Sequence, residues 1–209
     1  MLRLGTARIG QITKPVGQRR GEVCFIDVAE TLGLVGARSL DDVLDLPDDD
    51  HAEAIAELRK AEAKLDANKV DLLAPLLRPA RIRDCGMTHL EPAFEQMITR
   101  MSEVDSDDSR AAQELLRTRL SSTGARGPLS WGERDADTLS GTKARIVNPG
   151  GELDFELELA VILRRSKSGA PQIFGYTLYN DWTLRDVQVA NFIATRNLHG
   201  PAKNFPRAN

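Results

Sequence analysis

The 209-residue chain is poor in the residue types that usually mark redox, zinc and histidine-based sites. Its two cysteines, Cys24 and Cys85, form neither a C-x-x-C pair nor a disulfide framework. We therefore expect two reduced thiols and a cytoplasmic protein. The three histidines, His51, His89 and His199, are few and widely spaced, so their pattern predicts no histidine-based metal site.

Several classes of partner and chemistry are excluded in the same way. The formal net charge is -3, from 28 basic and 31 acidic residues, and no dense basic block predicts a nucleic-acid partner. No apolar run approaches the roughly 18 residues that a membrane span needs, so we expect no membrane partner. The first residues, MLRLGTARIGQITKP, lack the apolar core of a secretory signal. Phosphate-binding glycine loops and the G-x-S-x-G elbow are also missing.

What remains is an ordinary globular composition, with 41% hydrophobic and 28% charged residues. The segment GEVCFID, residues 21 to 27, predicts a strand after a glycine. The apolar stripe of residues 51 to 66 predicts a helix with a solvated charged face. Residues 71 to 86 are apolar and interrupted by prolines, which indicates extended chain between two parts. We expect a small α/β domain over residues 1–75 and a second domain over 76–209.

The second part changes its periodicity along the chain. A helix is predicted to start near Glu91, and its apolar stripe over 94–101 indicates core packing. A further helical piece is expected over 110–120, and the segment 121–141 is rich in glycine and serine, which is typical of a loop. From about Lys143 the period becomes two. It predicts strands in 143–151, 152–163 and 172–182, before a helix in 185–198.

The segment DFELELAVIL, residues 154 to 163, places carboxylates on one face of a strand. Glu156 and Glu158 then lie about 7 Å apart at Cα on the same side. Their repulsion is relieved if the face is solvated, or if a divalent cation such as Mg²⁺ or Ca²⁺ lies between the carboxylates. Pairing with the next strand could bring Asp181 beside them, although Asp181 would also serve as a helix N-cap. The pattern leaves both interpretations open.

Three motifs together resemble the fumarylacetoacetate hydrolase family. They are DFELELAVIL, GYTLYNDWTLRDVQ and GPAKNF, in this order and spacing. The resemblance is strongest over 125–209 and is specific only in combination. It implies an α+β fold with a mixed β-roll of the fumarylacetoacetase C-terminal-domain type, incomplete here, and a small N-terminal β-rich domain.

The resemblance also implies roles for individual residues. Glu156, Glu158 and Asp181 match the metal ligands of the family, whose usual ion is Mg²⁺, with Mn²⁺ or Ca²⁺ in some members. Lys203 matches the active-site lysine. Arg185 and Gln188 fall at positions that contact the substrate, a small-molecule 2-keto acid. The implied activity is metal-dependent hydrolysis of a C–C bond in an acylpyruvate-like 2-keto acid, by a homodimer.

Two departures from the family pattern keep alternatives open. Family hydrolases carry a water-activating histidine before the metal strand, but Met97 stands where it is expected. His89 is the candidate base nearby, with a cap or surface histidine as the alternative, and Asp84 is a candidate additional acidic ligand. A missing base favours dehydration of a 2-keto-3-deoxy sugar acid instead.

The second departure is that the resemblance ends at the lysine loop, so the catalytic domain looks truncated. We expect such a chain to be poorly stable and largely inactive alone. A fragment that only binds metal is therefore a further alternative.

Overall fold

The computed structural model describes residues 1–86, 90–121 and 130–205. The chain forms two compact units that are interleaved along the sequence. The first consists of Met1–Ala80, Leu139–Ala144 and Leu159–Leu178, and the second of Arg81–Thr138, Arg145–Glu158 and Tyr179–Asn209. The two consecutive domains expected from the sequence, 1–75 and 76–209, stay a prediction. None of the helices in the described ranges is long and apolar enough to cross a membrane.

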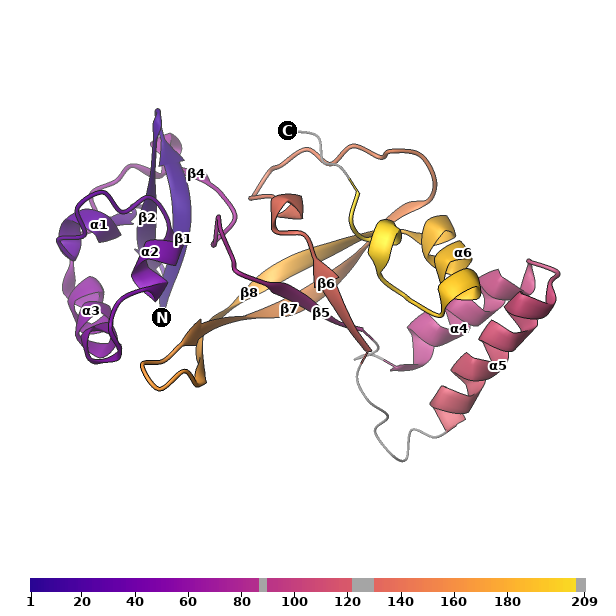
Figure 1. Ribbon diagram of the computed structural model, residues 1–209. Helices are drawn as coiled ribbons and strands as arrows, with labels where there is room; N and C mark the ends of the chain where they lie inside the picture. The colour runs from indigo at the N-terminus through magenta and orange to yellow at the C-terminus, as the bar shows by residue number, and fades with distance from the viewer. Residues whose placement is uncertain (87–89, 122–129, 206–209) are drawn as a thin grey trace. The chain divides into compact units, whose positions relative to one another are not determined.

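The first unit is built on a four-stranded antiparallel sheet with the strand order β3-β2-β1-β4 (Figure 1). Strands β1 (Leu2–Ile9) and β2 (Ile12–Arg19) form a hairpin whose turn contains Gly10 at a φ of 62°. Glycine adopts this left-handed conformation without the steric clash of a Cβ. Short strands β3 (Ile26–Asp27) and β4 (Asp71–Leu72) pair at the two sides of the hairpin.

Helices α1 (Val28–Thr31), α2 (Leu40–Leu44) and α3 (Asp48–Lys60) supply the core of this unit, and the 3₁₀ turn η1 spans Ala67–Lys69. The core is formed by buried aliphatic residues from the sheet and all three helices: Ile26, Val28, Leu40, Val43 and Leu58. Of the strand predicted over 21–27, only the last two residues are a strand. The carboxylate of Asp27 accepts from the backbone N–H of Glu30, and this cap starts a helix at Val28.

The second unit pairs β5 (Ile82–Gly86) with β6 (Ser130–Arg134) in an antiparallel ladder. Helices α4 (Leu90–Ser102), α5 (Asp107–Ser121) and α6 (Arg185–Thr195) pack together, and the 3₁₀ turns η2 (Ala136–Thr138) and η3 (Gly200–Ala202) lie in the connections. Their shared core contains Ile98, Met101, Ala112, Leu116, Val189, Phe192 and Leu198. Strand β6 lies inside the segment predicted to be loop, so that prediction was wrong there.

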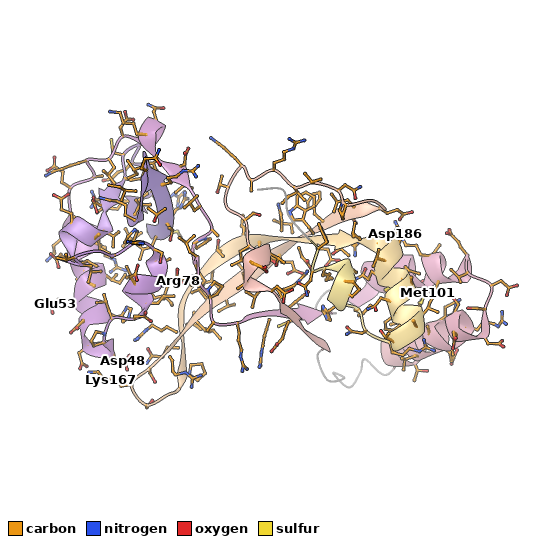
Figure 2. The ribbon with its side chains drawn as sticks, turned by 45° about the horizontal axis from the view of Figure 1, so that its top comes forward. Asp48, Glu53, Arg78, Met101, Lys167 and Asp186 are labelled. Carbon is orange, nitrogen blue, oxygen red and sulfur yellow. The ribbon has the colours of Figure 1, made fainter. Side chains whose placement is uncertain are left out.

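Strands β7 (Leu153–Arg165) and β8 (Pro171–Leu184) form a long two-stranded sheet whose residues contribute to both units. In the first unit, the turn between them is fixed to the start of α3. The Arg164 guanidinium lies 2.7 Å from the Asp48 carboxylate. The same carboxylate accepts from the backbone N–H of Lys167, and Figure 2 labels both Asp48 and Lys167. Both strands were predicted, but the strand expected over 143–151 is irregular chain.

Candidate metal centre

The ladder of β5 and β6 places one acidic and one basic side chain, Asp84 and Arg134, on the same face. Asp84 pairs in register with Gly132, and Arg134 follows two residues later, so the side chains of Asp84 and Arg134 lie on the same face. Both side chains are buried, and Arg134 Nη2 donates to Asp84 Oδ2 at 3.1 Å. A buried arginine needs such partners because an unpaired charge away from water is strongly unfavourable.

The acidic face of β7 is turned inward, and the apolar face is exposed. Glu156 and Glu158 are partly buried, whereas Phe155 and Leu157 are 54% and 66% exposed. Asp181, on the paired strand β8, is fully buried at 0% exposure. The alternation predicted from DFELELAVIL is therefore present, and the Glu156 and Glu158 side chains are partly shielded from solvent, whereas Asp154 is exposed.

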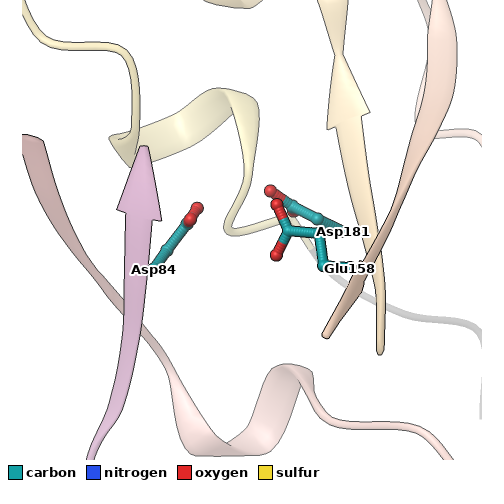
Figure 3. Close-up of side chains that lie close together, drawn as sticks. All are labelled: Asp84, Glu158 and Asp181. Carbon is teal, nitrogen blue, oxygen red and sulfur yellow. The ribbon is translucent and has the colours of Figure 1, made fainter. Parts of the chain in front are cut away.

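Three carboxylates converge in the second unit (Figure 3). Oxygen atoms of Asp84, Glu158 and Asp181 all lie within 4.8 Å of one another. The three residues come from β5, β7 and β8, so the cluster exists only when these strands are assembled. Three hard oxygen donors at this spacing are a donor set that suits Mg²⁺, Mn²⁺ or Ca²⁺.

Two cations share this cluster. Lys203 Nζ contacts the Asp181 carboxylate and lies 3.6 Å from Asp84 Oδ2 and 3.7 Å from Glu156 Oε2. Arg134 also contacts Asp181, and its Nη1 donates to the backbone carbonyl of Lys203 at 2.6 Å. Arg134 therefore joins the β5–β6 ladder, β8 and the loop that carries the lysine.

Burial and neighbouring charges shift the pKa values of Glu158, Asp84 and Lys203 in different directions. Burial raises the pKa of Glu158 above its usual range, and the nearby Asp84 charge adds to this. For Asp84, burial acts in the same direction, but the contact with His199 and the charges of Lys203 and Arg134 outweigh it, so the pKa is held low. Burial lowers the pKa of the Lys203 ammonium, against the opposing effect of Glu156 and Asp84.

The charge balance of the cluster fits a divalent cation. The acidic groups of the triad and its neighbours are Asp84, Asp154, Glu156, Glu158 and Asp181. The cationic groups that pair with them are Arg134, Arg185 and Lys203. Two negative charges are left over. Within the described residues, Glu158 forms no ion pair or hydrogen bond, so its carboxylate is available as a ligand.

The remaining predicted site residues lie beside this cluster. Glu156 lies outside the triad, and its Oε1 is 2.6 Å from Arg185 Nη1. Arg185, the first residue of α6, also binds Asp154 at 2.9 Å. Gln188 is buried; it accepts from Arg185 at 3.1 Å and donates to the carbonyl of Leu198. Gln188 thus fixes the orientation of the Arg185 guanidinium through this hydrogen bond.

His89, the predicted general base, lies outside the described residues. Sequence reasoning missed two members of the cluster, Arg134 and His199. Arg134 was assigned to a loop, and His199 was dismissed because it is far from the other histidines. No periodic pattern in the sequence marks either residue, because Arg134 reaches the cluster through the β5–β6 ladder and His199 through the start of η3.

An open groove of about 680 Å³ lies beside Asp154 and Arg185 in the second unit. Its walls come from α4 and from the start of β7, and Arg185 lines it while also contacting Glu156. Arg100 and Glu152 form an ion pair across these two elements. The groove therefore presents charged groups next to the acidic face of β7.

Comparison with known proteins gives one family and two similar structures. Residues 111–208 match the family model described as the fumarylacetoacetate (FAA) hydrolase C-terminal domain. A fumarylacetoacetate hydrolase from the psychrophilic Exiguobacterium antarcticum is 18% identical, with a TM-score of 0.56 over 98% of this chain and 62% of that one. A protein assigned as HpcE from Mycobacterium smegmatis is 15% identical, with a TM-score of 0.57 over 98% of this chain and 60% of that one.

These identities are low, so the structural matches indicate a shared fold. No match was found among curated proteins. The chain spans about three fifths of the length of both solved structures. A mixed α/β fold with small sheets, similar to structures of this family, is therefore shown, while the β-roll and the small N-terminal domain stay predictions.

Proposed function

We propose that the chain is a metal-dependent enzyme of the fumarylacetoacetate hydrolase family, whose C-terminal model matches residues 111–208, and that it hydrolyses a C–C bond in an acylpyruvate-like 2-keto acid. The observation that carries the metal dependence is the buried triad of Asp84, Glu158 and Asp181. These three residues would hold the ion, with Mg²⁺ proposed as the natural metal. When bound, the ion would supply Lewis-acid chemistry at a substrate carbonyl.

The chain's own residues support the chemistry in complementary ways. Lys203 keeps a positive charge beside the carboxylates, where it stabilises negative charge that develops on a substrate oxygen. Arg185 lines the groove, and its Nε and Nη1 already bind Asp154 and Glu156, so we propose that its Nη2 donates to the carboxylate of a 2-keto acid. Gln188 holds this guanidinium in place through its side-chain oxygen.

A second candidate is dehydration of a 2-keto-3-deoxy sugar acid. In the described part of the second unit, the histidine beside the triad is His199. Its Nδ1 lies 3.2 Å from Asp84 Oδ2, so this nitrogen faces a carboxylate of the triad. Met97, which stands where family hydrolases carry a water-activating histidine, packs against the helical core. Elimination of a substrate hydroxyl needs no activated water, so these two observations support the dehydratase as the second candidate.

Titration calorimetry with Mg²⁺ and Mn²⁺ tests the metal site. We expect the wild-type chain to bind, and Asp181→Asn and Glu158→Gln to lose binding by about 10-fold or more, since each removes a charged ligand. Glu133→Gln is the matched control because Glu133 is exposed on β6. Glu156→Gln separates the sequence-based ligand set from the triad: a loss equal to that of Glu158→Gln would make Glu156 a ligand as well.

Product analysis with 2-keto acids distinguishes the reactions. Hydrolysis gives two carbon fragments, whereas dehydration gives one product and water. Metal binding without turnover of either substrate class by the folded chain would contradict the enzymatic proposal and leave a metal-binding fragment. Absence of metal binding by the folded wild-type chain would contradict the proposed metal centre itself.

A further inference from the structure

The glycine at position 132 leaves room for an imidazole directly beside Asp84. Gly132 pairs in register with Asp84, so a side chain there would lie next to that carboxylate. Instead, the ring of His199 fills the space: a Cβ on Gly132 would lie 2.3 Å from both Cγ and Nδ1 of His199. Contacts this short do not occur between real atoms, so the two side chains exclude each other.

His199 is held firmly in that space. Its side chain is buried, and its Nδ1 lies 3.2 Å from Asp84 Oδ2. Its backbone N–H donates to Asn197 Oδ1 at 2.9 Å, and its carbonyl accepts from Asn191 Nδ2 at 3.1 Å. Neither ring nitrogen makes a well-aligned hydrogen bond to a described group. An imidazole this close to a carboxylate oxygen needs its proton on Nδ1, where it can be donated.

The described nitrogen atoms around Asp84 all approach one of its oxygens. Arg134 Nη2 lies 3.1 Å, His199 Nδ1 3.2 Å and Lys203 Nζ 3.6 Å from Oδ2. Within the described residues, Oδ1 has no hydrogen-bond partner. The carboxylate is therefore held through one oxygen, and the other is left for a further ligand.

We propose that His199 is a positioning residue of the metal centre, which holds Asp84 through Oδ2 and so directs Oδ1 to the cation. The inference rests on the proposed metal site and adds a residue outside the ligand set. Gly132 belongs to this arrangement because any side chain at position 132 would displace the imidazole of His199. Outer hydrogen bonds of this kind fix the orientation of a ligand and affect metal affinity.

Calorimetry with Mn²⁺ and Mg²⁺ tests this role without any substrate. We expect His199→Ala to weaken binding by about 10- to 100-fold. His199→Asn should keep most of the affinity, because its amide nitrogen lies where Nδ1 does, whereas His199→Gln places its amide at the position of Nε2 and should not. Circular dichroism melts confirm that each variant is folded.

Gly132→Ala provides an independent test through the same contact. It should weaken binding about as much as His199→Ala, and the double variant should be no weaker than either single one, because both changes remove one interaction. Gly5→Ala is the matched control, since a Cβ at Gly5 meets nothing within 4 Å. If Gly132→Ala does not fold, the difference in metal affinity between His199→Asn and His199→Gln decides whether a donor at Nδ1 is needed.

The outcomes separate this inference from the proposed function. A folded wild-type chain that binds neither ion contradicts the metal centre and with it the role of His199. Wild-type binding that is unchanged in His199→Ala leaves the metal centre standing and overturns the positioning role. Equal losses in the Ala, Asn and Gln variants would also overturn it, because they would indicate general packing rather than a donor at Nδ1.

Discussion

At the scale of single residues, two acids of the same cluster respond to burial in opposite ways. Glu158 lacks a described ion-pair partner, and burial raises its pKa above the ordinary value of 4.5. Asp84 is surrounded by His199, Lys203 and Arg134, which hold its pKa low despite burial. The folded state therefore binds a proton more tightly than the unfolded state at Glu158 and less tightly at Asp84.

This difference predicts opposite pH dependences for two amide variants in the presence of a chelator. A raised carboxyl pKa makes the folded state lose stability as pH rises from the ordinary pKa through the raised one, so Glu158→Gln should be more stable than wild type at neutral pH. The advantage should shrink toward pH 4. A lowered pKa stabilises the folded state above the unfolded value, so Asp84→Asn should be destabilised at neutral pH and less so in acid.

Urea unfolding followed by circular dichroism between pH 4 and 8 measures both effects. Glu133→Gln serves as the control, because this exposed glutamate should change stability little at any pH. Curves for Glu158→Gln and Asp84→Asn that shift by the same amount at every pH would contradict the assigned protonation shifts.

How far the site could be predicted depends on the sequence distance between its members. Glu158 and Asp181 were expected to lie close together because a period of two and one neighbouring strand relate them, and their carboxylates do lie close together. Asp84 was only a possible extra ligand, and Arg134 and His199 were missed, because they approach through the β5–β6 ladder and the turn η3. Local periodicity carries no information about such long-range contacts.

At the scale of elements, α6 connects the cluster to the helical core. It begins at Arg185, directly after β8 ends at Leu184, and its buried residues include Gln188 and Phe192. The same helix therefore supports Arg185 at its first turn and fills the core at its third. A loss of packing along α6 should disturb the site as well as stability.

Replacing Phe192 by alanine tests this connection. Phe192 is 0% exposed, so we expect a destabilisation of about 3–5 kcal/mol in urea unfolding, from lost burial and the cavity left behind. Phe155→Ala is the matched control: this phenylalanine is 54% exposed, and we expect about 1 kcal/mol or less. Equal effects at the two positions would contradict the packing described for α6.

The elements themselves were predicted unevenly. Helix α4 and strands β7 and β8 follow strong periodic patterns and were located from the sequence. Strand β6 was predicted as loop because its glycine and the surrounding glycines and serines are typical of turns. Here the glycine has a packing reason, since its missing side chain admits the ring of His199. Local composition cannot distinguish a glycine that forms a turn from one that leaves space for a neighbouring side chain.

At the scale of the whole molecule, one face of the β7–β8 sheet is apolar and exposed. In the first unit, the exposed apolar residues of this face are Leu159, Val161, Leu163, Tyr176 and Leu178. Contiguous apolar surface of this kind usually marks an interaction site. We propose that a second copy of the chain covers it, in line with the homodimer that the family resemblance implies.

Analytical ultracentrifugation tests this association. We expect wild-type dimers that dissociate on dilution, and monomers for the double variant Val161→Lys/Leu163→Lys, because charges on an apolar interface oppose its burial. Val35→Lys is the control, since Val35 is fully exposed and belongs to the connection between α1 and α2. A wild-type chain that stays monomeric, or a double variant that dimerises as well as wild type, would contradict the proposed interface.

The separation of the three carboxylates along the chain has a consequence for the order of assembly. Asp84 is synthesised long before Glu158 and Asp181, and its strand finds its partner β6 only after two helices have been made. A cation bound by all three would close very long loops, whose entropy must be lost before the ion can contribute. Metal capture should therefore be a late event in folding, and a chain interrupted before β8 would carry Asp84 and Glu158 without the third ligand, Asp181.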